Sequence, residues 1–268
     1  MDVSIIIVNF NTRQMTSECI DSIIEKTQGL EFEIILVDNA STDGSKEFFE
    51  KDERITYIYS EKNGGFGYGN NLGMKVAKGK YFFLLNSDTL LINNAIKEFY
   101  DYAEKDNKNC IYGCYLEHKD GSYSTSFFYF PAFSIKDFIC NKIHPQNYTP
   151  TYQETNVEVI SGTDMFFHRE IYEKTGGFDE NIFLYGEEGE WQYRMLRYGY
   201  HGYLINTPRI IHLAGQSIKE SPAIMKIKRK SHFYILKKHM LYPTYLLARI
   251  YYATNLLIRN ITHWKDKD

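Results

Sequence analysis

The chain has 268 residues, 43% of them hydrophobic and 24% charged, which fits one large α/β domain, or one domain with an appendage, with a packed core and argues against a disordered chain. The net charge of −3 is uneven, because residues 219–268 hold 11 Lys and Arg against 3 Asp and Glu, or +8, and the rest carries −11. An acidic body argues against nucleic acid as the main partner, and the basic end favours an anionic surface.

Cysteine spacing and the first residues indicate the compartment. Cys19, Cys110, Cys114 and Cys140 form no CxxC pair and no zinc pattern, so a reduced cytosolic protein is expected. The first residues begin a strand at once, without the basic segment of a signal peptide. We therefore expect a cytoplasmic protein.

Apolar strands and amphipathic helices alternate through the first part of the chain. Residues 3–9 (VSIIIVN) form a continuous β-branched run, typical of a parallel strand buried on both faces. Apolar residues at helical spacing predict a helix over 12–28, which ends before Gly29. The other predicted elements are strands at 32–37, 55–59 and 81–85 and helices at 45–49, 64–77 and 93–105. This alternation predicts a doubly wound, mostly parallel sheet, with ligands beyond the carboxyl ends of its strands.

The second half of the chain is less regular. Residues 123–133 are aromatic and predict loops near an acceptor, and residues 157–169 predict two strand segments separated by Gly162. A helix is predicted over 187–198. A helical segment is predicted from residue 225 onward, with a break at Pro243.

Polar side chains follow three of the predicted strands. Asn9, Asp38 and Asp88 each end or closely follow an apolar run, where a doubly wound sheet binds its ligand. Asp38 can accept a hydrogen bond from a pyrimidine N3–H or from ribose hydroxyls. Asp88, in the sequence Asn86-Ser87-Asp88, is placed to hold Mg²⁺ or Mn²⁺. The alternative for both carboxylates is a turn or a helix cap.

A glycine-dense segment, residues 63–73 (NGGFGYGNNLG), opens a predicted helix after the third strand. Its glycines allow the backbone to approach a phosphate at a helix N-terminus, whereas a tight turn accounts for only one or two of them. The segment is not a dinucleotide fingerprint, which follows the first strand, and it lacks the Gly-Lys-Ser/Thr of a P-loop.

Acidic residues crowd the start of the helix predicted over 187–198. One interpretation of Glu187, Glu188 and Glu190 is a general base with residues that orient it or the acceptor. The other is that they complement the dipole at the start of a helix. His212 follows an apolar pair and is either a ligand of a metal or diphosphate, or a packed or capping residue.

Seven segments, in this order and spacing, make the chain resemble glycosyltransferase family 2 and, within it, the bacterial rhamnosyltransferase-like branch. They read VSIIIVNFN, IILVDNASTDGS, NGGFGYGNNLG, FFLLNSDT, SGTDMFFHRE, GGFDENIFLYGEEGEWQYR and IIHLAGQS. The resemblance implies a GT-A fold, an α/β architecture with a Rossmann-like, mostly parallel central sheet flanked by helices. It implies a catalytic domain over 1–218, with a nucleotide-sugar half (1–110) and an acceptor half (111–218), and a basic, apolar helical tail (219–268).

The resemblance also implies roles for individual residues. Asp88 would bind the metal with His212 nearby, and Glu188 would be the catalytic base, supported by Glu187 and Glu190. Because Glu188 stands where the family has Asp, the base stays open between these two glutamates, and Asn86 stands where the family has its first Asp. The residues expected to bind the nucleotide sugar are Asn9, Asn11, Asp38, Asn63, Gly64, Gly65, Asn70, Asn86 and Ser87. Those expected on the acceptor side are Gly162, Thr163, Asp164, Glu190 and Trp191.

The family implies inversion at the anomeric carbon by direct displacement, with Mg²⁺ or Mn²⁺ as cofactor. The expected donor is a dTDP- or UDP-linked sugar, dTDP-rhamnose included, because thymine and uracil share the N3–H that Asp38 would contact. The expected acceptor is a glycan or a lipid-linked precursor in cell-surface polysaccharide synthesis.

The tail has the pattern of a helix that lies on a membrane. Residues 241–261 are largely apolar but are interrupted by Pro243, Arg249 and Arg259, so they fall short of a clean span. Six Lys and Arg between residues 226 and 238 favour a helix on the inner face of the membrane. A helix packed on the domain or in a dimer is the alternative.

Two other functions fit part of the pattern. A nucleotidyltransferase would need a glycine-rich loop with Arg and Lys directly after the first strand, and residues 9–13 (NFNTR) lack it. A non-catalytic sugar-nucleotide-binding relative would be expected to lose Asp88 or the acids near Glu188, and both are present.

Overall fold

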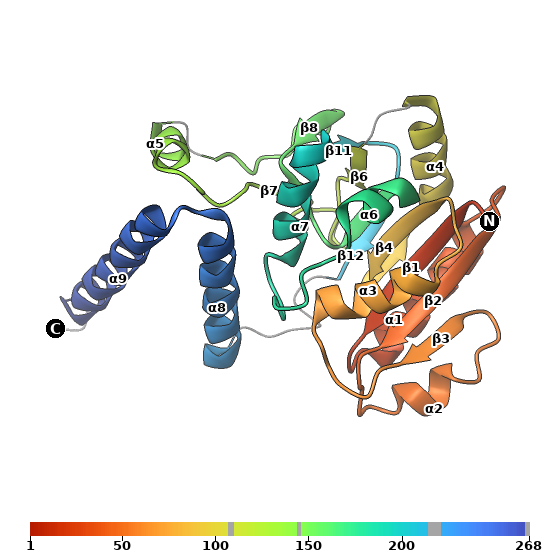
Figure 1. Ribbon diagram of the computed structural model, residues 1–268. Helices are drawn as coiled ribbons and strands as arrows, with labels where there is room; N and C mark the ends of the chain where they lie inside the picture. The colour runs from red at the N-terminus through yellow and green to blue at the C-terminus, as the bar shows by residue number, and fades with distance from the viewer. Residues whose placement is uncertain (107–109, 144–145, 214–220, 266–268) are drawn as a thin grey trace.

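A mixed eight-stranded sheet forms the centre of the computed structural model, which describes residues 1–106, 110–143, 146–213 and 221–265 (Figure 1). The side chains at 106, 142 and from 255 onward lie outside this description. The strand order is β3-β2-β1-β4-β10-β6-β11-β8, and the first four strands pair in parallel. β10 is antiparallel to both β4 and β6, β11 is parallel to β6, and β8 is antiparallel to β11. The expected α/β fold with a mostly parallel sheet is confirmed.

The strands and helices have the following bounds. The strands of the large sheet are β1 (Val3–Asn9), β2 (Phe32–Asp38), β3 (Thr56–Tyr59), β4 (Tyr81–Asn86), β6 (Cys110–Cys114), β8 (Thr155–Val157), β10 (Asp164–His168) and β11 (His201–Ile205). Two small pairs are β5 (Thr89–Leu91) with β12 (Ile210–His212), and β7 (Phe127–Phe128) with β9 (Val159–Ile160). The helices are α1 (Arg13–Lys26), α2 (Ser45–Phe49), α3 (Phe66–Val76), α4 (Ala95–Asp106), α5 (Ile135–Ile143), α6 (Arg169–Thr175), α7 (Glu187–Met195), α8 (Pro222–His239) and α9 (Tyr242–Lys265), and a 3₁₀ turn spans Leu196–Tyr198.

The central strands β1, β4, β10 and β6 are buried on both faces, which explains their uninterrupted apolar runs. Ile5 and Ile7 of β1 join the core under α1 and α4, whereas Ile6 joins the core under α3, α6 and α7. Full burial of each such side chain contributes about 1.5–3 kcal/mol. Helices on both faces therefore fix the strands, and with them the residues that follow the carboxyl ends.

The second half of the chain completes the same sheet. β10 inserts between β4 and β6, so the border expected between residues 110 and 111 falls inside β6. The sequence did not predict β6, β8, β11 or α5, and the aromatic segment expected as loops contains β7. Strands of two to five residues carry too few positions for a periodic pattern, and pairing with neighbours decides them.

The glycine-dense segment packs a helix onto a strand. Gly69 and Gly73 of α3 lie against Val8 and Ile6 of β1, where an added Cβ would stand 2.7 and 2.4 Å from those side chains. Close approach of α3 to β1, and not of the backbone to a phosphate, accounts for these two glycines.

The tail folds as two helices. α8 ends at His239 and α9 begins at Tyr242, so the expected break falls just before Pro243, which lies in the first turn of α9 where no backbone N–H is needed. α8 packs on the rest of the chain through an apolar cluster that includes Ile182 and Ile235. The expected border between 218 and 219 lies outside the described residues. Among the described residues, no helix combines the length and apolar character needed to cross a membrane.

Candidate active site

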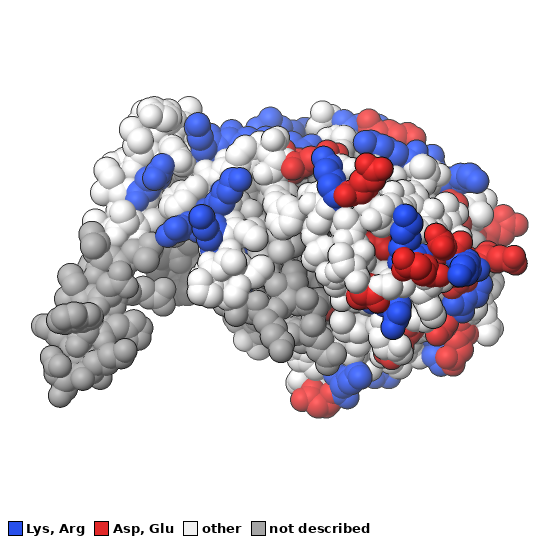
Figure 2. Space-filling view, turned by 90° about the horizontal axis from the view of Figure 1, so that it is seen from below, with Lys and Arg blue, Asp and Glu red and all other residues white. Residues whose placement is uncertain are grey.

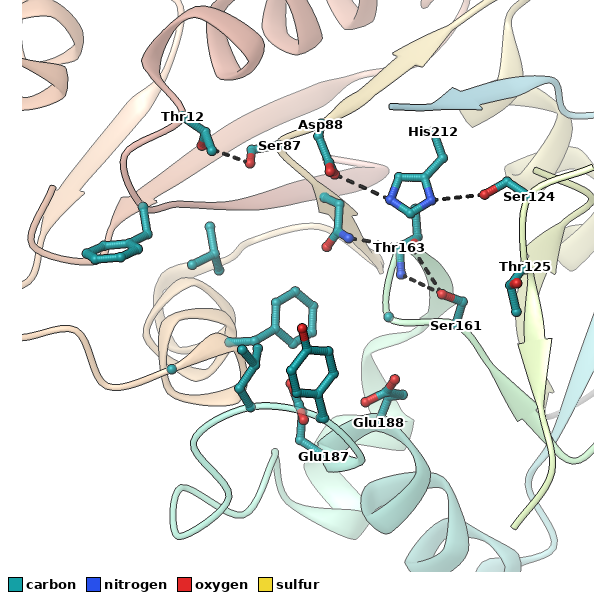
Figure 3. A pocket seen from close by; sticks show the side chains of 18 of the residues that line it. Thr12, Ser87, Asp88, Ser124, Thr125, Ser161, Thr163, Glu187, Glu188 and His212 are labelled. Atoms are coloured by element: carbon teal, nitrogen blue, oxygen red, sulfur yellow. Dashed lines mark hydrogen bonds and ion pairs between the residues drawn. The ribbon is translucent and has the colours of Figure 1, made fainter. Parts of the chain in front are cut away.

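A cavity of about 630 Å³ lies beyond the carboxyl ends of β1 and β4, where this topology is expected to bind a ligand (Figure 3). Its walls come from residues that follow β1 to β4, from residues 118–128 and 161–163, and from the loop that leads into α7. Segments far apart in the chain therefore meet at one edge of the sheet.

Asp88 and His212 form one side of this cavity. β5 pairs with β12, so Thr89 lies opposite His212 and Asp88 Oδ1 stands 3.5 Å from His212 Nε2. His212 Nδ1 lies 3.2 Å from Ser124 Oγ. The contact with Ser124 holds the imidazole ring so that its other nitrogen faces Asp88.

The donor set of Asp88 and His212 fits a divalent cation shared with a substrate. A carboxylate oxygen and an imidazole nitrogen suit Mn²⁺, and the carboxylate suits Mg²⁺, which completes its shell with phosphate and water oxygens. Within the described residues, no group of three or more His, Cys, Asp or Glu side chains is gathered as for a metal. The residues present therefore fit an ion that takes most of its ligands from a bound diphosphate and water.

Glu187 and Glu188 face the cavity from the first turn of α7, on the side away from Asp88 (Figure 3). Glu187 is 2% exposed, and its Oε2 atom makes no hydrogen bond within the described residues. Burial, followed by the charge of Glu188, raises the pKa of Glu187 well above its usual range. Burial also raises the pKa of Glu188, which is half-buried on the wall. A raised pKa makes a carboxylate a stronger proton acceptor, so both side chains suit a general base.

The loop between β9 and β10 contacts both the segment that carries Asp88 and the wall that carries Glu188. An added Cβ at Gly162 would lie 4.0 Å from the Cβ of Glu188. The backbone N–H of Asn86 donates to the Thr163 carbonyl at 3.0 Å, and Asn86 Nδ2 lies 3.5 Å from Thr163 Oγ1. This loop fixes the position of the segment before Asp88 relative to the wall that carries Glu188.

Two asparagines and a phenylalanine shape another part of the wall. Asn39 Nδ2 donates to Asn63 Oδ1 at 3.1 Å and to the Gly65 carbonyl at 3.0 Å, and the Gly65 N–H donates to Asn63 Oδ1 at 3.0 Å. Phe10, which is 44% exposed just beyond β1, also lines the cavity. Its ring offers an apolar face on which a planar base can stack.

Ten of the sequence-predicted site residues line this one cavity. They are Asn63, Gly65, Asn86, Ser87, Asp88, Gly162, Thr163, Glu187, Glu188 and His212. The structure thus brings the expected metal pair and both candidate bases into a shared space.

Asp38 does not reach the cavity wall, contrary to the placement expected from the sequence. It is fully buried at the end of β2, where its carboxylate accepts hydrogen bonds from the Ser41 N–H at 2.8 Å and the Tyr57 hydroxyl at 2.9 Å. Its neighbour Asn39 occupies the wall instead. Asp88 and Glu188 therefore share the cavity, whereas Asp38 does not line it.

Four more residues expected at the nucleotide sugar lie behind or beside the wall. Asn9 is fully buried at the end of β1, and Asn11 Oδ1 accepts the Thr42 N–H at 2.7 Å. Gly64 precedes the lining residue Gly65, and Asn70 lies in α3, where its Nδ2 donates to the carbonyl of the lining residue Phe66 at 3.1 Å. Neither lines the cavity itself.

Three residues expected on the acceptor side lie in the interior. Asp164 is fully buried, its Oδ2 accepts the Cys114 N–H at 2.7 Å, and burial raises its pKa to about 8. Trp191 is in the core, where its Nε1 donates to Thr175 Oγ1 at 3.0 Å. Glu190 pairs with basic side chains of α7 and α8. Only the start of α7 faces the cavity, because the helical period turns the next residues away from it.

Sequence patterns did not single out several lining residues. Aromatic residues in loops and in the two-residue strand β7 have no periodic pattern that would predict them. In the folded chain their exposure distinguishes them, since Phe10, Phe128 and Phe183 are 36–44% exposed. The segment 123–133, expected near an acceptor, does contribute to the wall. Outside that segment, the unpredicted lining residues in the loops include Phe10, Asn39, His118, Ser161, Phe183, Leu184 and Tyr185.

Comparisons with known proteins point to one family. The sequence model of Glycosyl transferase family 2 matches residues 4–176. The chain is 32% identical over 131 residues to Glycosyltransferase GlyG of Streptococcus pneumoniae. These aligned residues make up 47% of this chain and 43% of the relative. It is 33% identical over 119 residues to a poly(ribitol-phosphate) beta-glucosyltransferase of Bacillus spizizenii, 42% of this chain and 19% of the relative. The aligned part thus spans less than half the length of these relatives.

A solved structure shares the fold. The crystal structure of GalNAc-T7 with UDP, GalNAc and Mn²⁺ superposes with a TM-score of 0.62 at 15% identity, covering 79% of this chain and 44% of that one. At this identity the likeness concerns the fold alone.

Proposed function

The chain belongs to glycosyltransferase family 2, and from that premise we propose that it transfers a sugar from a nucleoside diphosphate donor to a hydroxyl group, with inversion at the anomeric carbon. One observation carries the proposal: a single cavity is lined by the Asp88–His212 pair and by the two carboxylates of Glu187 and Glu188. A donor diphosphate and an acceptor hydroxyl need these two kinds of group within one space.

We propose Glu188 as the base. Its carboxylate accepts the proton of the acceptor hydroxyl while the hydroxyl oxygen attacks the anomeric carbon, and the bond between that carbon and the diphosphate oxygen breaks. Its place on the wall beside Gly162 and its raised pKa support the choice. Glu187 also lines the cavity but is almost fully buried, so its carboxylate is less accessible to an acceptor hydroxyl.

Asp88 and His212 would hold Mg²⁺ or Mn²⁺ together with the donor diphosphate. When bound, the ion supplies positive charge that offsets the negative charge developing on the leaving diphosphate. The Ser124 contact to His212 would keep the imidazole oriented for this role. The fold neighbour was crystallised with UDP and Mn²⁺, which supports a divalent cation.

The donor is proposed to be a UDP- or dTDP-linked sugar, with rhamnose among the candidates. Phe10 and Asn39 would contact its base, in place of the buried Asp38. The acceptor is proposed to be a glycan or lipid-linked precursor of a cell-surface polysaccharide, which the poly(ribitol-phosphate) glucosyltransferase among the relatives supports. Phe128 and Phe183 offer apolar faces for the sugar rings.

A donor panel tests this function. The purified protein is incubated with UDP-, dTDP- and GDP-sugars, with and without Mn²⁺, and nucleoside diphosphate is measured. Glu188→Gln should bind the donor normally and lose at least about 100-fold in turnover, the usual size of a general-base effect. Glu173→Gln, at an exposed position on α6, is the matched control and should behave as the native chain.

Other outcomes of the same panel would contradict the proposal. Release of pyrophosphate would indicate a nucleotidyltransferase, and donor binding without turnover under every condition would indicate a non-catalytic relative. Full turnover by Glu188→Gln together with loss in Glu187→Gln would move the base to Glu187.

We further propose that the chain docks on the cytoplasmic face of the membrane through α5, α8 and α9, called here the tail lobe. In the view of Figure 2, Lys and Arg appear over this lobe without Asp or Glu, whereas both kinds of charge are mixed over the rest of the molecule. α8 carries six Lys and Arg and no acidic residue. The large apolar side chains that α5 and α9 expose are Ile135, Phe138, Ile139, Ile143, Tyr242, Leu246, Leu247, Ile250, Tyr251 and Tyr252. Basic residues beside exposed apolar ones suit an anionic lipid surface.

Vesicle sedimentation tests this docking. Vesicles that contain phosphatidylserine should bind the chain, binding should weaken with salt, and neutral phosphatidylcholine vesicles should bind less. Leu247→Glu with Ile250→Glu should weaken binding about tenfold or more, because each side chain would bury apolar surface in the lipid. Val76→Glu, an exposed apolar residue on α3, is the control. Equal binding by both variants, or dimers in place of lipid binding, would refute the docking.

A further inference from the structure

Residues 179–190 carry the candidate bases, and α8 of the tail lies along them. This segment starts at Asp179, passes Phe183, Leu184 and Tyr185 on the cavity wall, and enters α7 at Glu187. In the sequence, α8 belongs to the basic tail and is separate from this segment. In the folded chain, α8 nevertheless contacts the start, the middle and the end of the segment.

Lys238 of α8 joins the two ends of the segment. Its ammonium group pairs with Asp179 Oδ2 and, at 2.8 Å, with Glu190 Oε1. Glu190 has no exposed side-chain surface and also pairs with His239 Nε2 at 3.0 Å and Arg194 Nε at 3.1 Å. Although burial opposes it, contacts with His239 and Lys238 hold the pKa of Glu190 below its usual range. A buried carboxylate needs such partners, so Glu190 ties α7 to α8.

The middle of the segment is held as well. Ser231 Oγ donates to the Leu184 carbonyl at 2.7 Å, and Lys228 Nζ lies 4.6 Å from the centre of the Tyr185 ring. Gly186, with φ +92°, packs so closely on Ile235 that an added Cβ would stand 2.8 Å from its Cδ1. The turn just before Glu187 is therefore shaped against α8.

We propose that Lys238 is a positioning residue for the base: by bridging Asp179 and Glu190, it holds the first turn of α7 so that Glu188 faces the anomeric carbon. This inference rests on the proposed function. It gives α8 a part in turnover that its basic composition alone would not predict. A displacement of about 1 Å at a reacting group can lower a rate about 100-fold, so a loose bridge should affect turnover before donor binding.

Two substitutions separate this role from the general charge of the tail. Lys238→Met should lower kcat about 10- to 100-fold with donor KM within about twofold, and Lys238→Arg should restore most of kcat because it keeps a cation between the two carboxylates. Lys237→Met, at the neighbouring exposed position, should leave both constants unchanged. Native kcat in a folded Lys238→Met variant, or equal loss in Lys237→Met, would overturn the inference.

A readout that needs no turnover keeps this test distinct from that of the proposed function. Hydrogen exchange of the amides from residue 184 to 188 should be at least about tenfold faster in Lys238→Met than in the native chain or Lys237→Met. Where Lys238→Met does not fold, Asp179→Asn breaks one end of the same bridge and should give the same result. Unchanged exchange in the folded variant would overturn the bridge. Native protein that releases no nucleoside diphosphate would instead contradict the proposed function.

Discussion

Gly65→Ala should damage the active site far more than its effect on stability explains. Gly65 has φ +92° and ψ 177°, a region that side chains rarely adopt, and an added Cβ would stand 1.8 Å from the Phe183 carbonyl oxygen. Contacts of a Cβ below 3.0 Å essentially do not occur, so that carbonyl must move by more than 1 Å. Phe183 lies in the segment that leads to Glu188, and a shift of this size lowers turnover about 100-fold.

Gly176→Ala is a matched control for the backbone. Gly176 has φ +71° and ψ −173°, and nothing lies within 4 Å of its added Cβ. Both substitutions should therefore cost about 1–3 kcal/mol of backbone strain, but only Gly65→Ala has the steric conflict. Thermal unfolding measures the shared loss of stability, and nucleoside diphosphate release, well below both midpoints, measures activity.

The comparison of these two variants tests whether the contact between Gly65 and Phe183 affects turnover beyond the loss of stability. We expect turnover within about threefold of native for Gly176→Ala, since its added methyl group displaces no neighbour, and a loss of about 100-fold for Gly65→Ala. Equal activity at equal unfolded fraction would show that the contact between Gly65 and Phe183 has no bearing on the base.

Burial and charge at named residues lead to three further predictions. Asp88→Ala should remove the Mn²⁺ dependence of donor binding in calorimetry, and Mn²⁺ that still strengthens binding would contradict the assignment. Burial raises the pKa of Glu187, so the folded protein is stable with this carboxyl protonated and loses stability as the pH rises through the raised pKa. Glu187→Gln should therefore be about 1 kcal/mol more stable to unfolding than the native chain at pH 8 and equally stable at pH 4. A stabilisation that is the same at both pH values would refute this. In the native protein, only the thiol of exposed Cys140 should react rapidly with a thiol reagent. The other three cysteines are buried, and burial raises the pKa of Cys19 to about 12. Rapid reaction of more than one thiol would contradict the fold.

Local pattern predicted β1, β2 and β4 well because most residues of those strands are buried. The run from Val3 to Asn9 matches β1 at both ends, and the helices predicted in the first half lie within two residues of α1, α2, α3 and α4 at each end. Turn chemistry also indicated where chain segments leave the sheet, which is why the motif that carries Asp88 was found. Local pattern could not separate residues on the wall from residues one position behind it.

Asp38 and Asn39 illustrate that limit. Asp38 is the last residue of β2 and Asn39 follows it, but Asp38 is turned toward Tyr57 and Ser41, whereas Asn39 faces the cavity. The choice depends on which donors the neighbouring strand and loop supply. The orientation of Glu190 on α7 likewise depends on distant partners, since Lys238 and His239 lie on a helix 48 and 49 residues later in the chain.

The amino-acid sequence by itself determined the family, the alternation of strands and helices, and the chemical types of the acidic and metal-binding side chains, because these depend on local composition and spacing. Only the tertiary structure decided the insertion of β10 between β4 and β6, the pairing that sets Asp88 beside His212, and the packing of α8 along the segment that carries Glu188. Those outcomes rest on contacts between distant segments, and such contacts form only when burial of the whole core fixes where each segment lies.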